Sequence, residues 1–164
     1  ILRDPEPLPP CDVILTESTY GDRLHPPRKE MERQLESLLT EAKGWNGRIL
    51  IPAFSVGRTQ NALWYLGQLI EAGRLEPLPI YVDSPLSTKA TTIVARHTEL
   101  YDEETRALME GGHDPFFFPG VRCVQDVEGL LQQAPIRFRS RLRVGKHLRL
   151  CGCVYAIGVL CLCV

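Results

Sequence analysis

The loop Phe54–Arg58 contains residue types that bind a phosphate group. Ser55 can cap the helix predicted to follow, Gly57 lets the backbone approach a ligand closely, and Arg58 can form paired hydrogen bonds with a phosphate. Free N–H groups and the helix dipole also favour an anion at a helix start. An ordinary capped helix with a surface arginine gives the same pattern, so the loop alone does not decide between the two. The Gly-rich Lys-Ser/Thr loop of nucleotide hydrolases is missing here, so ATP binding is not indicated.

Two further segments place acids at the ends of predicted strands. Glu17 ends the apolar run Asp12–Glu17, where a carboxylate can act as a general acid or base or orient another catalytic group. A carboxylate that bonds only its own loop is the alternative interpretation. Asp83 ends the run Pro79–Asp83, and Ser84 after it is typical of a helix cap.

The histidines do not form a recognisable metal motif. His-x-His and His-Glu-x-x-His are both missing from the sequence, and the four histidines are scattered along it as His25, His97, His113 and His147. The sequence therefore indicates no catalytic zinc site of its own.

Short apolar runs alternate with amphipathic helix patterns along most of the chain. The predicted strands are 12–17, 48–53, 79–83 and 121–124, and the predicted helices are 28–43, 59–72, 85–97 and 102–110, the last with Asp102 as its N-cap. This alternation predicts an α/β fold with a parallel twisted sheet flanked by helices. Ligands in such sheets bind beyond the carboxyl ends of the strands, so we expect the three polar segments to converge on one rim.

Charge is distributed unevenly along the 164 residues, which form about one domain and carry a net charge of −1. Residues 1–136 hold thirteen basic and twenty acidic side chains, a net charge of −7. Residues 137–149 hold six basic side chains and no acid, and residues 150–164 carry no charge. The overall balance excludes a polycation that binds nucleic acid through bulk charge alone, and the break suggests a separate C-terminal stretch.

Six cysteines are present, and four of them lie in the uncharged stretch, as Cys151, Cys153, Cys161 and Cys163. The chain opens on Ile-Leu-Arg-Asp-Pro, which is not the pattern of a signal peptide. A disulfide scaffold is therefore not expected, and the predicted location is the reducing cytoplasm.

Four motifs resemble a known family in their order and spacing. They are Glu17–Arg23 (ESTYGDR), Ile51–Gln60 (IPAFSVGRTQ), Tyr81–Leu86 (YVDSPL) and Asp114–Phe116 (DPF). Together they look like the β-CASP region of metallo-β-lactamase-fold nucleases that process RNA, of the ribonuclease J and cleavage-and-polyadenylation endonuclease type. The resemblance covers roughly residues 1 to 135.

The resemblance implies roles for several residues. Glu17 matches the acidic motif that lies near the zinc site and pairs with a later histidine, which makes it the catalytic candidate. The loop around Ser55 and Arg58 borders the RNA cleft in the family, and with Gly57 and Ser84 it forms the expected RNA- or phosphate-binding set. The family uses two zinc ions to activate a water that attacks a phosphodiester. The implied partner is RNA, no membrane partner is indicated, and a homo-oligomer is left open.

The chain also departs from the family pattern. The family's main zinc ligands precede the segment that this sequence resembles, and its later histidine motifs are not recognisable after residue 135. We therefore expect residues 1–11 to be a connector from a metallo-β-lactamase core, residues 12–135 to be a β-CASP-like domain, and residues 136–164 to be an atypical, irregular tail. A frame-shifted reading of the gene is the favoured explanation of the tail. A membrane tail and a metal site of two Cys-x-Cys pairs are the alternatives, although fifteen uncharged residues fall short of the roughly 20 needed to span a bilayer.

The predicted function follows from the resemblance. We expect the RNA-facing cap of a zinc-dependent ribonuclease that is inactive as this isolated chain. A non-catalytic nucleic-acid-binding or regulatory fragment is the alternative. An unrelated Rossmann-like binding domain is disfavoured, because Tyr20-Gly21-Asp22 stands where a Gly-x-Gly-x-x-Gly motif would follow the first strand.

Overall fold

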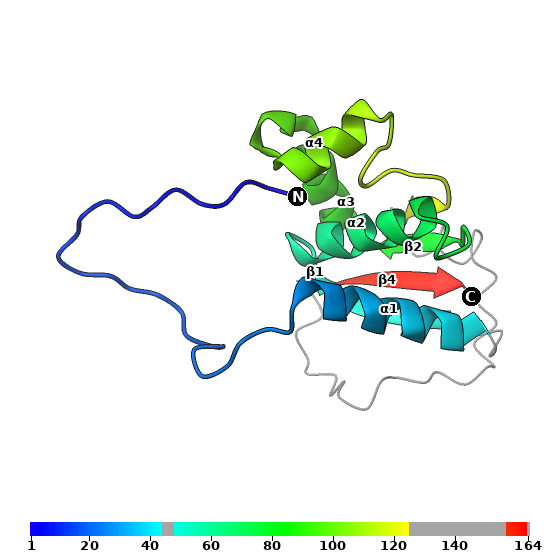
Figure 1. Ribbon diagram of the computed structural model, residues 1–164, viewed down its shortest axis with the longest axis horizontal. Helices are drawn as coiled ribbons and strands as arrows, with labels where there is room; N and C mark the ends of the chain where they lie inside the picture. Colours follow the sequence, from blue (N-terminus) through cyan, green and yellow to red (C-terminus); the bar gives the residue numbers. More distant parts are fainter. Residues whose placement is uncertain (44–47, 125–156, 164) are drawn as a thin grey trace.

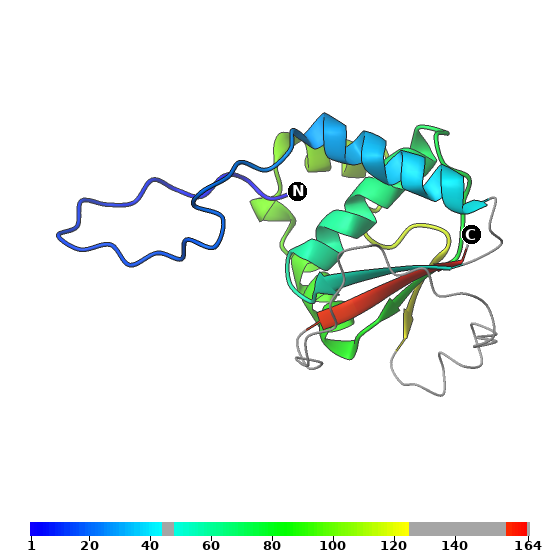
Figure 2. The ribbon, with the colours of Figure 1, turned by 90° about the horizontal axis from the view of Figure 1, so that it is seen from below.

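A computed structural model describes residues 1–43, 48–124 and 157–163 of the chain. Within these residues, a four-stranded sheet carries helices α1 and α2 on one side (Figure 1; Figure 2). The strands are β1 (Arg48–Phe54), β2 (Ile80–Asp83), β3 (Val121–Val124) and β4 (Ile157–Cys163). The helices are α1 (Arg28–Lys43), α2 (Arg58–Glu71), α3 (Pro85–Arg96), the short 3₁₀ helix η1 (Thr98–Leu100) and α4 (Glu103–Glu110). The fold is therefore α/β, as the alternation of patterns predicts.

The sheet has the strand order β1-β4-β2-β3. β2 and β3 pair in parallel, and β4 pairs antiparallel with both β1 and β2. β1, β2 and β3 consequently run in the same direction, as expected, while β4 runs against them in the middle of the sheet. The C-terminal stretch for which no regular structure was expected thus contributes a strand at 157–163. Its uncharged composition, with β-branched residues among the seven, suits a central strand with neighbours on both sides.

The register brings two strand ends to the same rim of the sheet. Phe54 at the end of β1 pairs with Ile157, and Asp83 at the end of β2 pairs with Val159. The two partners are two residues apart at the start of β4, so the chain segments that leave β1 and β2 begin side by side.

Helix α2 supplies much of the apolar core. Leu63, Leu66 and Leu69 recur with a spacing of three residues, which places them on one face of the helix. This face is buried in one cluster with Ile80 and Val82 of β2. Burial of each such side chain contributes about 1.5–3 kcal/mol to the free energy of unfolding. The helix therefore has little freedom to move relative to β2.

Two aspartates fix the chain around α4. Asp102 is the N-cap, as predicted, because its Oδ1 accepts a hydrogen bond of 2.8 Å from the Thr105 N–H. Burial alone raises the pKa of Asp102, but hydrogen bonds from the Ile1 amino group and from Thr105 outweigh it and hold the pKa at about 2. Asp114 Oδ1 accepts from two backbone N–H groups, those of Phe116 and Phe117, at 2.8 Å each. The Asp114–Phe116 motif is therefore a turn, and it directs the fully buried Phe116 ring into the core.

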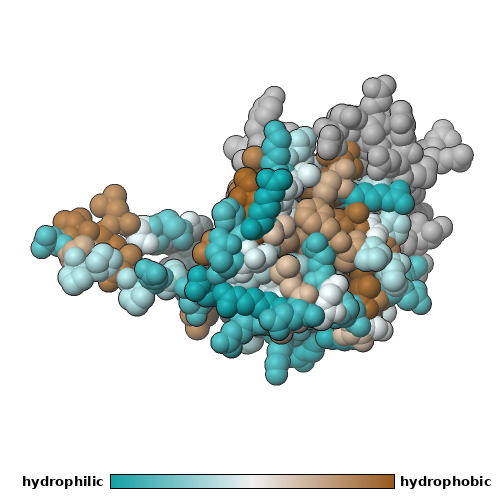
Figure 3. Space-filling model, turned by 90° about the horizontal axis from the view of Figure 1, so that it is seen from above, coloured by the Kyte–Doolittle hydropathy of each residue, from teal (hydrophilic) through white to brown (hydrophobic). Residues whose placement is uncertain are grey.

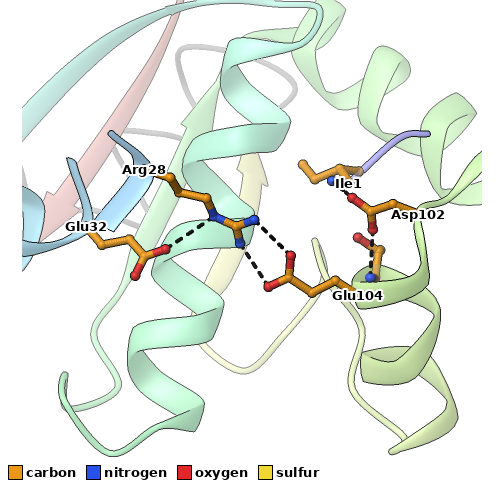
Figure 4. A network of polar contacts seen from close by, with 6 residues as sticks. Ile1, Arg28, Glu32, Asp102 and Glu104 are labelled. Atoms are coloured by element: carbon orange, nitrogen blue, oxygen red, sulfur yellow. Dashed lines mark hydrogen bonds and ion pairs between the residues drawn. The ribbon is translucent and has the colours of Figure 1, made fainter. Parts of the chain in front are cut away.

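Arg28 joins three helices (Figure 4). Its guanidinium donates to both carboxylate oxygens of Glu104 on α4, at 2.8 and 2.9 Å, and to Glu32 on α1 at 3.3 Å. It also lies 4.3 Å from the centroid of the Trp64 ring on α2. The hydrogen bonds with Glu104 raise the pKa of Arg28 above its ordinary value. Its charge is therefore held where the three helices meet.

The strand predicted at Asp12–Glu17 does not form, and this expectation is wrong. The segment is extended and exposed, and the chain around it projects away from the sheet (Figure 1; Figure 2). Val13, Ile14 and Leu15 are 75%, 61% and 95% exposed, and apolar residues show on the surface of the projection (Figure 3). An apolar run becomes a strand only where another strand accepts its hydrogen bonds. No strand among the described residues pairs with residues 12–17.

Candidate phosphate site at the rim of the sheet

The N-termini of α2 and α3 meet beyond the carboxyl ends of β1 and β2. The hydroxyl oxygens of Ser55, after β1, and Ser84, after β2, lie 3.4 Å apart. α2 begins at Arg58 and α3 at Pro85, so Ser84 immediately precedes its helix, whereas Ser55 lies three residues before the start of α2. Helix N-termini carry partial positive charge and free N–H groups, so two of them side by side favour an anion.

The loop between β1 and α2 has a tight, left-handed turn at Gly57. Its φ of +82° is a backbone conformation that glycine adopts readily and other residues rarely do. No atom outside its immediate neighbours lies within 4 Å of the position where a Cβ would sit. Gly57 therefore meets the expectation of an accessible backbone in this loop. Arg58 follows it at the start of α2, and its side chain is exposed and forms no ion pair with another described residue.

The predicted cap of α2 is wrong in one respect. The sequence predicts Ser55 as the cap of this helix, but the N-cap is Gly57, which has no side chain that could cap it. Gln60 Oε1 instead accepts the Gly57 N–H at 2.6 Å. Ser55 precedes the N-cap by two residues, and its hydroxyl faces Ser84 instead of the helix end.

Ser84 caps α3, as the sequence indicates. Its Oγ accepts a hydrogen bond of 3.1 Å from the Ser87 N–H, and Pro85 occupies the first position of the helix. Asp83 lies beside it at the end of β2, where burial raises the pKa of its carboxyl group. A carboxylate close to an anion site opposes anion binding, and the raised pKa reduces that opposition only toward acidic pH.

Glu17 does not join this rim. It lies on the projecting segment and is exposed, and its Oε2 accepts a hydrogen bond of 2.9 Å from the Thr19 N–H. That backbone hydrogen bond lowers the pKa of Glu17, so the side chain is a carboxylate anion at neutral pH. Of the three polar segments expected to converge, the structure brings together the two that follow β1 and β2.

Sequence reasoning missed a buried polar pair behind the loop. Gln60 on α2 is 2% exposed and Thr91 on α3 is 1% exposed, and Gln60 Nε2 donates to Thr91 Oγ1 at 2.7 Å. A signal was present in the sequence, because Gln60 lies three and four residues before the core positions Leu63 and Trp64. A glutamine on the apolar face of a helix needs partners for both its oxygen and its nitrogen.

Metal and membrane features are not found in the described residues. No group of three or more His, Cys, Asp or Glu side chains among residues 1–43, 48–124 and 157–163 could hold a metal ion. This part of the chain therefore does not fit the two-zinc site that the family resemblance implies. None of the described helices combines the length and apolar character needed to cross a bilayer.

Comparison with known proteins shows a family match. The Beta-Casp domain matches residues 59–147, which begins within the domain expected at 12–135 and ends in the basic run. Ribonuclease TTHA0252 of Thermus thermophilus is 35% identical over 137 residues, which are 82% of this chain and 31% of that protein. Cleavage and polyadenylation specificity factor subunit 3 of Dictyostelium discoideum is 31% identical over 130 residues, which are 79% of this chain and 17% of that protein.

An RNase J-like protein of Methanocaldococcus jannaschii is 35% identical over 107 residues, which are 64% of this chain and 25% of that protein. The chain thus spans about a third of the length of these relatives or less. The domain match covers more than half of the chain. Together with the α/β fold and the order of the motifs, it shows that the chain belongs to the Beta-Casp domain family.

Proposed function

We propose that this chain is the RNA-facing cap of a zinc-dependent ribonuclease of the metallo-β-lactamase fold, and that the loop Ser55–Arg58 with Ser84 holds an RNA phosphate. The observation that carries the proposal is the 3.4 Å approach of Ser55 and Ser84, which brings the loop that leads into α2 beside the N-cap of α3. Membership of the Beta-Casp family and similarity to proteins named as ribonucleases make RNA the favoured anion.

Each proposed binding group has a distinct task. The free N–H groups at the two helix starts and the two serine hydroxyls can donate hydrogen bonds to phosphate oxygens. Gly57 leaves the loop open to the backbone of the RNA, since nothing stands within 4 Å of its missing Cβ. Arg58 supplies a full positive charge that no described acid neutralises, and a guanidinium can bind two phosphate oxygens at once.

Binding and orientation are the tasks that the described residues can perform. Zinc, when bound in a family enzyme, supplies the activated water for phosphodiester hydrolysis, but no described residues hold it. Glu17 is assigned the task of orienting a histidine, because an ionised and exposed carboxylate can accept a ring N–H. The proposed domain comprises residues 12–135, with a connector before it and an atypical tail from 136, and the proposed location is the cytoplasm.

The phosphate site is tested by Arg58→Ala. We expect this change to weaken binding of a 3′-fluorescein-labelled single-stranded RNA by roughly 1–3 kcal/mol, the range for charge-assisted hydrogen bonds. The dependence of log affinity on log salt should also become shallower by about one phosphate contact. Arg33→Ala on α1 is the matched control, because Arg33 is 70% exposed and pairs with Glu30. Unchanged affinity and salt slope for Arg58→Ala would remove the phosphate site.

The alternative function is a non-catalytic nucleic-acid-binding or regulatory chain. This alternative also predicts RNA binding, but it predicts that a protein containing this domain does not cleave RNA. Cleavage of the labelled RNA by a protein that joins this chain to the family's histidine motifs would decide for the ribonuclease.

A further inference from the structure

Gln60 uses its whole side-chain amide to connect the loop Ser55–Arg58 with α3. Its Oε1 accepts the Gly57 N–H at 2.6 Å, and its Nε2 donates to the Ser55 carbonyl oxygen at 3.1 Å and to Thr91 Oγ1 at 2.7 Å. With Gln60 only 2% exposed, water does not compete for these partners. The amide therefore holds the loop at two points of its backbone.

The connection continues through α3 to the second serine of the site. Thr91 Oγ1 donates to the Ser87 carbonyl oxygen at 2.8 Å, and the Ser87 N–H donates to Ser84 Oγ at 3.1 Å. A continuous path thus runs behind the rim from Gly57 to Ser84, through hydrogen bonds and the backbone of Ser87. The same two loops meet in front through the 3.4 Å contact between Ser55 and Ser84.

A glutamine is required by the chemistry of this path. The Gly57 N–H needs an acceptor, while the Ser55 carbonyl and Thr91 need donors, and a carboxamide offers both on one rigid plane. An ionised glutamate has no donor and would bury a charge, and leucine would leave the backbone groups without partners. The left-handed turn at Gly57 is therefore held by a side chain that comes from the helix following it.

We infer that Gln60 is a positioning residue for RNA phosphate binding: it fixes the backbone of the loop Ser55–Arg58, and with it Arg58, relative to Ser84. This inference rests on the proposed function, since it concerns the same site. If Gln60 were merely structural, it would stabilise the fold, and its removal would not change how much Arg58 contributes to RNA binding. The two roles differ in how Gln60 and Arg58 combine.

The first measurement follows the loop itself. Hydrogen exchange of the Gly57 amide, read by NMR on the full 164-residue chain, should become about tenfold faster in Gln60→Leu because its acceptor is lost. In Thr91→Val the same amide should be affected less, because Gln60 keeps its bonds to Gly57 and Ser55. Unchanged exchange in Gln60→Leu would overturn the inference at its first step.

The second measurement is a double-mutant cycle with the labelled RNA. Gln60→Leu should weaken RNA binding about as much as Arg58→Ala. The double variant should bind RNA as well as whichever single variant binds it less tightly, because both changes remove the same oriented contact. Additive losses would show that Gln60 affects RNA binding independently of Arg58, which contradicts the positioning role. If Arg58→Ala binds like the wild type, the proposed function fails, whereas a normal Arg58 effect with additive losses contradicts this inference only.

Threonine variants keep the test decisive if Gln60→Leu does not fold. Thr91→Val removes the hydroxyl that holds Gln60 and should weaken RNA binding about threefold or more, whereas Thr91→Ser restores the hydroxyl and should regain most of the affinity. Thr92→Val is the matched control on the same helix, because the Thr92 hydroxyl donates to the Thr88 carbonyl within α3 and takes no part in the path. Equal binding by Thr91→Val, Thr91→Ser and Thr92→Val would overturn the positioning role.

Discussion

Gly112 and Gly120 both have left-handed backbone angles, with φ of +83° and +104°, but their surroundings differ. A Cβ on Gly112 would meet nothing within 4 Å, whereas a Cβ on Gly120 would lie 2.6 Å from the Leu78 carbonyl oxygen. The Gly120 carbonyl in turn accepts the Ile80 N–H at 2.9 Å, where β2 begins. The close approach of the two backbones is therefore part of the pairing of β2 with β3.

We expect Gly120→Ala to destabilise the chain more than Gly112→Ala. Both variants incur the strain of a left-handed alanine, about 1 kcal/mol, but only Gly120→Ala must also displace a backbone carbonyl. Its total cost should exceed roughly 2 kcal/mol. Urea unfolding of the two variants, followed by circular dichroism, measures the difference. Equal midpoints and slopes would mean that the backbone near Leu78 moves away at little cost.

Glu17 presents a carboxylate to solvent in a conformation fixed by its own loop. The Thr19 N–H that lowers its pKa keeps it ionised, which suits an orienting anion and not a general acid. In a protein that joins this chain to the family's histidine motifs, we expect Glu17→Gln to lower single-turnover RNA cleavage by about 10²–10⁴. Zinc content and melting temperature should stay near wild type, because Glu17 is proposed to hold a histidine and not the metal.

Glu6→Gln is the control for that experiment, since Glu6 is an exposed acid on the same projecting segment. It should leave cleavage unchanged. Full activity of Glu17→Gln would leave Glu17 with its loop contact alone, and loss of zinc would mean that it acts as a ligand.

At the scale of elements, α3 begins with two serines in opposite situations. Ser84 Oγ caps the helix, whereas Ser87 Oγ is buried and finds no hydrogen-bond partner in the described part of the chain. We expect Ser84→Ala to cost about 1 kcal/mol of the free energy of unfolding, the usual effect of removing a cap. Ser87→Ala should be neutral or stabilising, because it removes an unpaired buried hydroxyl.

Thermal melting and urea unfolding of the two alanine variants provide the comparison, with retained helical circular dichroism as the check on folding. If Ser87→Ala destabilises as much as Ser84→Ala, the Ser87 hydroxyl has a partner in solution that the described residues do not supply.

The helices and the strands β1, β2 and β3 were predictable from the sequence to within a residue or two, and strand pairing was the unpredictable part. The residues that end each helix and the apolar spacing within it are local, so 28–43, 85–97 and the Asp102 cap could be placed to within a residue or two. Asp12–Glu17 has the apolar pattern of a strand but no partner strand in the described chain. β4 shows the reverse case, since its place between β1 and β2 depends on contacts more than seventy residues apart.

The candidate site divides in the same way. Ser55 and Ser84 could be brought together from sequence because each follows a strand, and parallel strands end at one rim. The tasks of Gln60 could not be assigned, because its partners Gly57, Ser55 and Thr91 come from a loop and from a second helix. Ser55 is predicted to cap α2 because serine favours that position, but Gln60, three residues after the Gly57 N-cap, makes the capping bond instead.

At the scale of the whole molecule, the proposed phosphate site lies within a segment of unfavourable charge. Residues 1–136 carry thirteen basic and twenty acidic side chains, so their net charge of −7 repels RNA at long range. Binding at the rim must therefore come from short-range contacts with the helix starts and Arg58. The six basic side chains of residues 137–149 carry positive charge that offsets this repulsion of RNA. Salt screens both the attraction and the repulsion.

Catalysis is the property for which this chain and the larger relatives should differ. Phosphodiester hydrolysis of the family type needs a water activated by metal ions. The described residues offer no group of three metal-binding side chains, and the sequence contains neither a His-x-His nor a His-Glu-x-x-His motif. We therefore expect the purified 164-residue chain to bind no stoichiometric zinc and to show no metal-dependent cleavage of labelled RNA, while it still binds the RNA.

Metal analysis by mass spectrometry, with cleavage assayed in added zinc and in chelator, measures both properties on one sample. About two equivalents of zinc together with chelator-sensitive cleavage would contradict the prediction. One equivalent of zinc without cleavage would contradict the part of the prediction that concerns zinc, and would favour a thiolate site in the Cys-x-Cys pairs. A zinc site closed by four thiolates leaves no open position for a reacting water.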